Sequence, residues 1–200
     1  MQSATILNLI TKGVQRGDAA WADFGSGEGR FTRALRALLG PDADIYTVDV
    51  DASTLERQRR TFGTHADVSR THFVEADFTQ PLDLPPLDGV LLANALHFIK
   101  DQTTMLKQLR AYLKPSGRLL VIEYDITRGS VWVPYPLPFR TLARLAPAAG
   151  FQQPVLLATT PSRFRSQIYS ALVLHTSYVN DGIEKWAPLG DSLADRGGDR

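Results

Sequence analysis

The sequence predicts an α/β protein built as a doubly wound, mainly parallel sheet with helices on both faces. Strand-like and helix-like segments alternate five times along the chain, which is typical of parallel sheets whose strands are connected by helices. The last two strand-like runs are joined without a long helix, so we expect an antiparallel pair at one edge. Hydrophobic residues make up 44% of the chain, as in ordinary globular domains with a buried core.

The first half of the chain alternates helices and strands. Ser53, three residues before Glu56, is predicted to be an N-cap,. Arg30, Arg33 and Arg36 share one side of their helix, and a solvated face is expected there,. The expected elements are a helix over 6–14, a strand over 19–24, a helix over 28–39, a strand over 44–50, a helix over 53–62 and a strand over 71–75,.

The second half continues the same pattern. Residues 87–93 are apolar at almost every position, as suits a central parallel strand that is buried on both faces. The segment 127–139 is rich in proline and aromatic residues and is expected to be a stiff loop,. The other expected elements are a helix over 101–113 ended by Lys114-Pro115-Ser116-Gly117, a strand over 118–124, a short helix ending at Gly150, and strands near 155–159 and 167–174,.

Length, charge and cysteine content restrict the classes of protein. The 200 residues suffice for one domain, which we expect over 1–176, with 177–200 as a flexible tail. A net charge of +1 lacks the basic excess of a nucleic-acid binder,. The absence of cysteine excludes a disulfide scaffold and a thiolate nucleophile,. No metal is expected. The chain has neither a signal-peptide pattern nor a membrane-spanning apolar run, so we expect a cytoplasmic protein.

The strongest chemical signal is the run Asp23-Phe24-Gly25-Ser26-Gly27-Glu28-Gly29, between the first strand and a helix. Glycines there permit tight turns and let a ligand approach backbone N–H groups at a helix N-terminus. The dinucleotide fingerprint would need glycine at position 30, which is Arg30,. The Gly-Lys-Ser/Thr of a P-loop is also absent from this run.

The second signal is Asp49, which ends the second strand 20 residues after Gly29. A carboxylate at this position can accept hydrogen bonds from both ribose hydroxyls of an adenosine ligand, because it offers two acceptor oxygens. A loop that does not match the pyrophosphate-binding patterns, followed by a ribose-binding carboxylate, indicates a nucleoside without phosphates.

Several segments, taken in order, resemble a known family. WADFGSGEGRFTRAL followed by YTVDVD resembles motifs I and II of the class I S-adenosylmethionine-dependent methyltransferases. FVEADF, LLANALHFI, LKPSGRLLVIEYD and AAGFQQP are similar to later segments of that family, and the resemblance covers about residues 4–175. It implies a Rossmann-like seven-stranded fold, S-adenosyl-L-methionine as cofactor and S-adenosyl-L-homocysteine as product.

The resemblance also implies roles for individual residues. Asp23 matches the acidic residue near the methionine amine, and Asp49 matches the ribose-binding acid. The remaining implied cofactor-binding residues are the loop residues Gly25, Ser26 and Gly27, the adenine neighbours Val50, Asp77 and Phe78, and Asn94 at the end of the fourth strand.

The catalytic candidates lie where the fourth and fifth strands end. They are His97, Tyr124 and Asp125, because open α/β sheets bind ligands beyond the carboxyl ends of their strands. His97 as a half-buried structural residue is an equally open interpretation. Trp132 and Tyr135 in the loop 127–139 either form a lid over the substrate or pack the loop onto the sheet.

The acceptor is expected to be a small molecule that is methylated at O, N or C. The Asp/Asn-Pro-Pro-aromatic sequence of amino-methyltransferases is replaced here by Asn94-Ala95-Leu96-His97. Cytosine C5 and arsenite enzymes depend on cysteine, which this chain lacks. A non-catalytic cofactor-binding or partner-binding protein of the same fold is the main alternative, and a nicotinamide-dependent oxidoreductase is a weaker one. No nucleic-acid or membrane partner is expected, and the chain is expected to be a monomer or homodimer.

Overall fold

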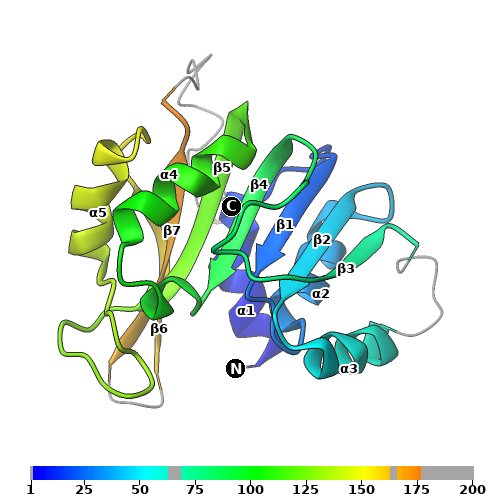
Figure 1. The fold of residues 1–200 in the computed structure, drawn as a ribbon, viewed down its shortest axis with the longest axis horizontal. Coiled ribbons are helices and arrows are strands. Elements are labelled where there is room, and N and C mark those ends of the chain that lie inside the picture. The colour runs from blue at the N-terminus through cyan, green and yellow to red at the C-terminus, as the bar shows by residue number, and fades with distance from the viewer. Residues whose placement is uncertain (1, 63–68, 163–165, 177–200) are drawn as a thin grey trace, which may run out of the picture.

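The computed structural model describes residues 2–62, 69–162 and 166–176. It contains a seven-stranded sheet with the order β3-β2-β1-β4-β5-β7-β6 (Figure 1). Strands β3, β2, β1, β4 and β5 are parallel neighbours, and β7 runs antiparallel to both β5 and β6. This topology confirms the predicted doubly wound α/β fold with an antiparallel C-terminal pair. The strands are β1 (Ala20–Phe24), β2 (Asp44–Asp49), β3 (Thr71–Glu75), β4 (Leu87–Ala93), β5 (Leu113–Tyr124), β6 (Val155–Pro161) and β7 (Gln167–Leu174).

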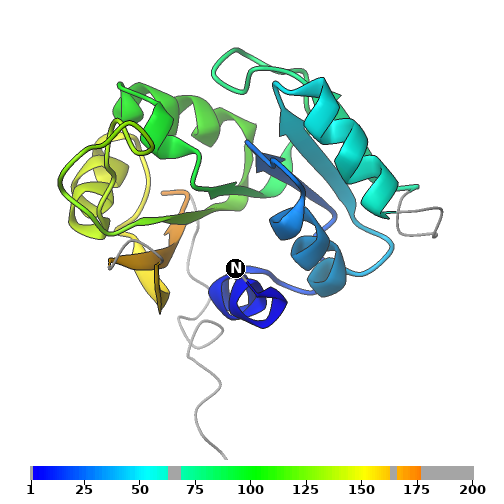
Figure 2. The ribbon, with the colours of Figure 1, turned by 90° about the horizontal axis from the view of Figure 1, so that it is seen from below.

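Helices cover both faces of the sheet. Figure 2 shows α1 and α2 on one side and α4 and α5 on the other. The helices are α1 (Ser3–Ile10), α2 (Arg30–Leu39), α3 (Ala52–Phe62), α4 (Gln102–Tyr112) and α5 (Phe139–Ala148), with short 3-10 turns η1 (Thr11–Gly13) and η3 (Leu96–Phe98).

Each face of the sheet has its own hydrophobic core, because successive side chains of a strand point to opposite faces. Leu91 of β4 packs with residues of α1 and α2. Its neighbours Val90 and Leu92 pack with residues of α4 and α5. All three side chains have no exposed surface, which explains why the sequence of this central strand is apolar at nearly every position.

The fifth strand begins earlier than predicted, at Leu113 rather than at Arg118. Leu87 pairs with Leu113 and Gly89 pairs with Arg118, so β5 bulges between these two points. Lys114 in the bulge places its Nζ 2.9 Å from both carboxylate oxygens of Asp88. The predicted turn over 114–117 is therefore an irregular part of the strand that is held against β4 by an ion pair.

The predicted N-cap of the third helix was also wrong by two residues. Asp51, not Ser53, accepts hydrogen bonds from the first turn of α3. Its Oδ1 takes the backbone N–H groups of Ser53 (2.9 Å) and Thr54 (3.2 Å), and its Oδ2 takes the Thr54 hydroxyl. Because α3 begins at Ala52, Ser53 lies within its first turn, and the Asp51 carboxylate before it accepts from several donors of that turn at once,.

The predicted tail over 177–200 lies outside the described residues. None of the helices within residues 2–62, 69–162 and 166–176 has the length and apolar character needed to cross a lipid bilayer.

Candidate functional site

The glycine loop, residues 25–29, connects β1 to α2 at the carboxyl edge of the sheet. Its glycines have positive φ angles of 71° at Gly25, 53° at Gly27 and 69° at Gly29, which L side chains rarely adopt. The backbone N–H groups of Gly25 and Ser26 donate to the Val48 carbonyl at 2.9 and 3.0 Å. A Cβ atom added to Gly27 would meet nothing within 4 Å. The loop is thus tied to β2, and Gly27 borders open space that a ligand could enter.

Asp49 joins the end of β2 to this loop. Its Oδ2 accepts the Gly27 N–H at 2.8 Å, and its Oδ1 accepts the Asp51 N–H at 3.0 Å. A carboxylate retains further acceptor positions after two such bonds, so these contacts orient Asp49 without using up its capacity for ribose hydroxyls. The next residue, Val50, is 63% exposed and presents an apolar side chain beside the same edge.

Asp23, near the end of β1, is almost completely buried. The Thr32 hydroxyl of α2 lies 2.6 Å from its Oδ2. Burial raises the pKa of Asp23 to about 7, and the negative charge of Asp49 adds to this effect, while the hydrogen bonds of Thr32 oppose it. A cationic ligand group placed beside Asp23 would favour its ionised form.

Asn94 follows β4 and has a strained backbone. Among the described residues it is the one non-glycine residue with positive φ, at 56°, a conformation that asparagine tolerates better than most residues. Its N–H donates to the Ile122 carbonyl of β5 at 2.8 Å. Its Oδ1 is buried and has no hydrogen-bond partner within the described part of the chain. A buried acceptor without a donor is costly, so a donor from a ligand would complete this position.

Asp77 and Phe78 follow β3 on the far side of Asp49, whose carbonyl accepts the Ala76 N–H at 3.0 Å. Asp77 is exposed, and its Oδ1 caps its own turn by accepting the Thr79 N–H at 2.9 Å. The Phe78 ring stacks on Phe24 of β1 with ring centres 5.7 Å apart. The sequence-predicted adenine neighbours are therefore brought to the same edge as the glycine loop.

His97 and Glu123 form a buried pair between η3 and the end of β5. The His97 Nδ1 lies 2.7 Å from a Glu123 carboxylate oxygen, and the His97 backbone N–H donates to the other oxygen at 3.2 Å. Their side chains are only 3% and 1% exposed. No described residue forms a hydrogen bond with the Nε2 atom of His97. The imidazole is thus oriented through its Nδ1 atom.

The segment that precedes His97 packs against the glycine loop. A Cβ atom on Gly25 would lie 3.0 Å from the Cβ of Ala95, which precedes His97 by two residues. The Tyr124 ring is centred 6.0 Å from the His97 ring, and burial together with the charge of Glu123 raises the pKa of Tyr124. The cofactor-binding and catalytic candidates therefore share one edge of the sheet.

Asp125, the third catalytic candidate, is tied into the loop that follows β5. Its Oδ1 accepts the Phe139 N–H at 3.1 Å, and its own N–H donates to the Gln167 carbonyl at 2.8 Å. These contacts give Asp125 a role in holding the two ends of the loop 127–139 together.

That loop is anchored in the middle and exposed at its tip. The Tyr135 N–H donates to the His97 carbonyl at 2.9 Å, and the Gln102 side chain donates to the Tyr135 carbonyl at 2.8 Å. Trp132 is 76% exposed. The loop is therefore positioned over η3 by its backbone, while its tryptophan faces solvent.

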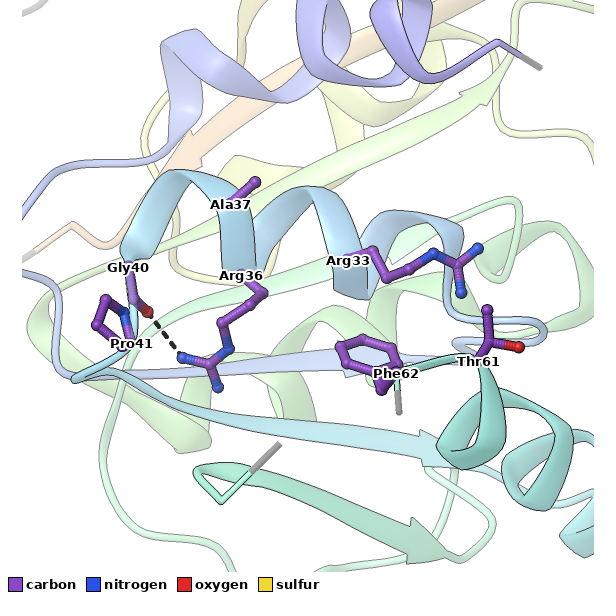
Figure 3. Close-up of a pocket in the computed structure, with 7 residues that line it drawn as sticks. All are labelled: Arg33, Arg36, Ala37, Gly40, Pro41, Thr61 and Phe62. Carbon is purple, nitrogen blue, oxygen red and sulfur yellow. Dashed lines mark hydrogen bonds between the residues drawn. The ribbon is translucent and has the colours of Figure 1, made fainter. Parts of the chain in front are cut away.

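A cavity of about 380 Å³ lies elsewhere, between α2 and α3 (Figure 3). None of the sequence-predicted site residues lines it. Arg36, predicted to be on a solvated face, is in fact buried and donates to the Gly40 and Ala43 carbonyls at 2.8 and 2.7 Å. The expectation for Arg36 was wrong because its guanidinium has several donors that satisfy backbone carbonyls at the end of α2.

The chain is similar to known methyltransferases. Residues 22–119 match the family model of a methyltransferase domain. The chain is 31% identical over 118 residues to the ubiquinone/menaquinone biosynthesis C-methyltransferase UbiE of Hahella chejuensis, covering 58% of this chain and 47% of that protein. It is 35% identical over 105 residues to the highly reducing polyketide synthase aurA of Calcarisporium arbuscula, covering 50% of this chain and 4% of that protein. The chain spans about half the length of the UbiE relatives.

Solved structures of methyltransferases have the same fold. The CcbJ methyltransferase from Streptomyces caelestis aligns with a TM-score of 0.68 at 14% identity, covering 88% of this chain and 96% of that one. Human N-acetylserotonin methyltransferase in complex with S-adenosylmethionine aligns with a TM-score of 0.62 at 20% identity, covering 86% and 51% of the two chains. The region that matches the family model, residues 22–119, is a methyltransferase domain. The chain resembles the class I S-adenosylmethionine-dependent methyltransferases, a family whose cofactor is S-adenosylmethionine.

Sequence reasoning missed the residues that support the site from behind. Gln58 of α3 is fully buried and contacts the glycine loop. A signal was present, because Gln58 lies at helical spacing between the apolar residues Leu55 and Phe62, and a polar residue within an apolar stripe indicates a buried polar contact. The pairing of Glu123 with His97 could not be predicted from the sequence, because the two residues lie 26 positions apart.

Proposed function

We propose that this chain transfers a methyl group from S-adenosylmethionine to a small-molecule acceptor, with His97 as the general base. The observation that carries the proposal is the buried His97–Glu123 pair, which adjoins the glycine loop through Ala95. An imidazole whose Nδ1 is oriented by a buried carboxylate is the arrangement that general bases use.

The residues at the edge fit the cofactor. Asp49 is oriented to accept hydrogen bonds from ribose hydroxyls, and the exposed Val50 offers an apolar surface to adenine. The unpartnered Oδ1 of Asn94 can accept from the ammonium group of the methionine part,. Asp77 and Phe78 complete the adenine side, and Asp23 lies beneath the loop. When bound, the cofactor supplies an electrophilic methyl group on a positively charged sulfur.

The His97–Glu123 pair supplies the proton chemistry. The carboxylate of Glu123 accepts a hydrogen bond from the Nδ1–H group. The lone pair of Nε2 is then free to accept a proton. As Nε2 takes a proton from the acceptor's O–H, N–H or activated C–H, the charge of Glu123 stabilises the imidazolium that forms. Phe98, which follows His97 in sequence, has an exposed ring, and the half-exposed Tyr135 is hydrogen-bonded to the His97 carbonyl. These two aromatic rings near His97 favour an acceptor with an apolar or aromatic part.

The direct test is methyl transfer into a cell metabolite extract. S-adenosylmethionine carrying a labelled methyl group is incubated with the extract and protein, and products are detected by mass spectrometry. We expect at least one labelled small molecule with the wild-type chain, and at least about 100-fold less of it with His97→Ala. Binding of S-adenosylhomocysteine without any labelled product in extracts of diverse source would favour the non-catalytic alternative.

Three expectations from the sequence remain predictions. They are a cytoplasmic location, a monomeric or homodimeric state and the lack of a nucleic-acid partner. Cell fractionation, light scattering on a sizing column and a gel-shift assay with DNA and RNA test them in turn.

A further inference from the structure

A chain of buried polar side chains connects Asp23 to the glycine loop. The Thr32 hydroxyl lies 2.6 Å from the Asp23 Oδ2 and 3.3 Å from the Thr47 hydroxyl. The Thr47 hydroxyl in turn donates to the Gln58 Oε1 at 2.7 Å. Asp23 is 1% exposed and the other three residues are 0% exposed. Buried polar groups of this kind are expected to be fully paired, so the position of each hydrogen matters.

Gln58 is the end of this chain that touches the loop. Its Nε2 donates to the Gly27 carbonyl at 2.9 Å and to the Ser26 Oγ at 3.2 Å. A Cβ atom on Gly29 would lie 2.4 Å from both Cγ and Cδ of Gln58. Gly29 therefore has to be glycine for two reasons: a side chain there would overlap with Gln58, and its φ angle is positive.

We propose that Gln58 is a positioning residue for the cofactor loop, and that the hydrogen bonds through Thr47 and Thr32 link the shape of this loop to the proton on Asp23. The inference rests on the proposed function only in assigning the loop to the cofactor.

Counting hydrogens shows how the link works. When Asp23 carries a proton, its hydroxyl can donate to Thr32, Thr32 can donate to Thr47, and Thr47 can donate to the Gln58 Oε1. Each hydroxyl then donates once and accepts once. The amide hydrogens of Gln58 continue in the same direction to Ser26 and Gly27, so every member of the chain is paired.

When Asp23 is ionised, the chain is one hydrogen short. The single hydrogen of Thr32 must point to the carboxylate, and Thr47 has one hydrogen for two acceptors, Thr32 and Gln58. Either the 3.3 Å contact between the threonines is lost or the bond to the Gln58 Oε1 is lost, and in the second case Gln58 is held less firmly against Gly27.

The charge that acts on Asp23 from the surrounding elements is that of Asp49 on β2. The residues that contact or pair with Asp23 are uncharged, namely Thr32 on α2, Thr47 on β2 and Leu91 on β4. Asp49 also accepts the Gly27 N–H, and Gln58 donates to the Gly27 carbonyl. A cationic ligand that favours ionised Asp23 would therefore affect Gly27 through Gln58, while Asp49 holds the N–H of the same residue.

The first experiment uses the chain without ligand and does not depend on its function. The Gln58 side-chain amide and the Gly27 backbone amide are followed by NMR from pH 5 to 9, together with the carboxyl carbon of Asp23. In wild type we expect the NMR signals of both amides to shift with pH along the titration curve of Asp23. In Asp23→Asn this pH-dependent shift should be absent. In Thr47→Val, Asp23 should still titrate while the amide shifts lose most of their amplitude. Full amplitude in Thr47→Val, or no shift in wild type, would overturn the proposal.

The second experiment measures S-adenosylhomocysteine affinity by calorimetry. Gln58→Met, which keeps length but removes both amide groups, should weaken binding about tenfold. The control Gln153→Met makes the same change at an exposed position and should leave the affinity unchanged. Equal affinity of Gln58→Met and wild type would overturn the positioning role. If Gln58→Met does not fold, Thr47→Val serves in its place, with a weaker affinity expected and an unchanged one contradicting the proposal. Absence of binding by wild type would instead count against the proposed function.

Discussion

At the scale of single residues, Asp49 combines two tasks that a substitution can separate. Asp49→Ala removes the acceptor of the Gly27 N–H and the predicted acceptor of the ribose hydroxyls. S-adenosylhomocysteine should bind about 10- to 100-fold more weakly, since loss of the hydrogen bonds from the ribose to this carboxylate should cost about 1.5–3 kcal/mol in all. Asp49→Asn should be intermediate, because one acceptor oxygen remains. Titration calorimetry decides the matter, and wild-type affinity in Asp49→Ala would place the cofactor elsewhere.

The His97–Glu123 pair makes a prediction about turnover rather than binding. His97→Ala should lower methyl transfer about 100-fold or more, as expected on loss of a general base, with S-adenosylhomocysteine affinity nearly unchanged. Glu123→Gln should lose part of the rate, because an amide oxygen can still accept the Nδ1 hydrogen but does not stabilise an imidazolium.

His72→Ala provides the matched control for His97→Ala. His72 lies on β3 beside Asp44, with its Nε2 2.8 Å from that carboxylate, and its side chain is 42% exposed. Its removal should leave turnover intact. Equal losses in both histidine variants would show that the rate reports folding rather than proton transfer.

Asp23 predicts an unusual dependence of stability on pH in the protein without ligand. Its pKa is raised from 3.8 to about 7 by burial, so the folded state holds a proton that the unfolded state releases. The stabilisation is complete below pH 3.8 and is lost as the pH rises toward 7,. In that window Asp23 lowers the free energy of unfolding by roughly 1.4 kcal/mol per pH unit.

Asp23→Asn should remove this slope, because the amide keeps an acceptor for the Thr32 hydroxyl and does not ionise. Urea denaturation of both proteins at pH 5, 6, 7 and 8 gives the comparison. Parallel curves for the two proteins across this range would contradict the raised pKa.

At the scale of elements, the parallel register brings the site together. Phe24 of β1 pairs with Val48 of β2 on one side and with Leu92 of β4 on the other. The glycine loop after β1, Asp49 at the end of β2 and Asn94 after β4 therefore lie side by side at one edge, where open α/β sheets bind their ligands. The loop 127–139 follows β5 and extends this edge.

The loop predicts a change in activity without loss of stability. Its backbone is fixed by the bonds of Tyr135 to His97 and Gln102, while Trp132 is 76% exposed. Trp132→Ala with Tyr135→Ala should therefore lower methyl transfer, leave S-adenosylhomocysteine affinity nearly unchanged and hardly move the melting temperature. The double variant Val155→Ala with Leu156→Ala, exposed apolar residues of β6, is the control. A large drop in melting temperature with full specific activity would assign the loop to packing.

At the scale of the whole molecule, ligand binding should stabilise the fold by mass action. S-adenosylhomocysteine at about 100 times its Kd contributes ~2.7 kcal/mol, which corresponds to a rise in Tm of about 5–10 °C for a domain of this size. NAD should give no comparable shift, since the loop has Arg30 where the dinucleotide pattern needs glycine,. Thermal melts with each ligand separate the two classes, and a shift with NAD alone would exclude the proposed cofactor.

Most elements and much of the site could be predicted from the sequence, because their signals are local. The apolar run 87–93 predicted the buried central strand, and the glycine run with Asp49 predicted a nucleoside site at the strand ends. The structure confirms the sheet and brings the predicted residues to one edge. Hydrophobic periodicity, glycine positions and strand ends are properties of short segments, so a single sequence is sufficient to find them.

Tertiary structure alone decided which polar groups meet. Asp51 rather than Ser53 caps α3, Arg36 is buried, and His97 is paired with Glu123. The same is true of Gln58, whose partners Gly27 and Thr47 lie 31 and 11 residues away. A polar side chain reveals its type in the sequence but not its partner, because hydrogen bonds depend on positions set by the packing of distant segments. The sequence by itself determined the architecture and the edge of the sheet where the candidate site residues gather, and the folded structure determined which polar side chains are hydrogen-bonded to each other there.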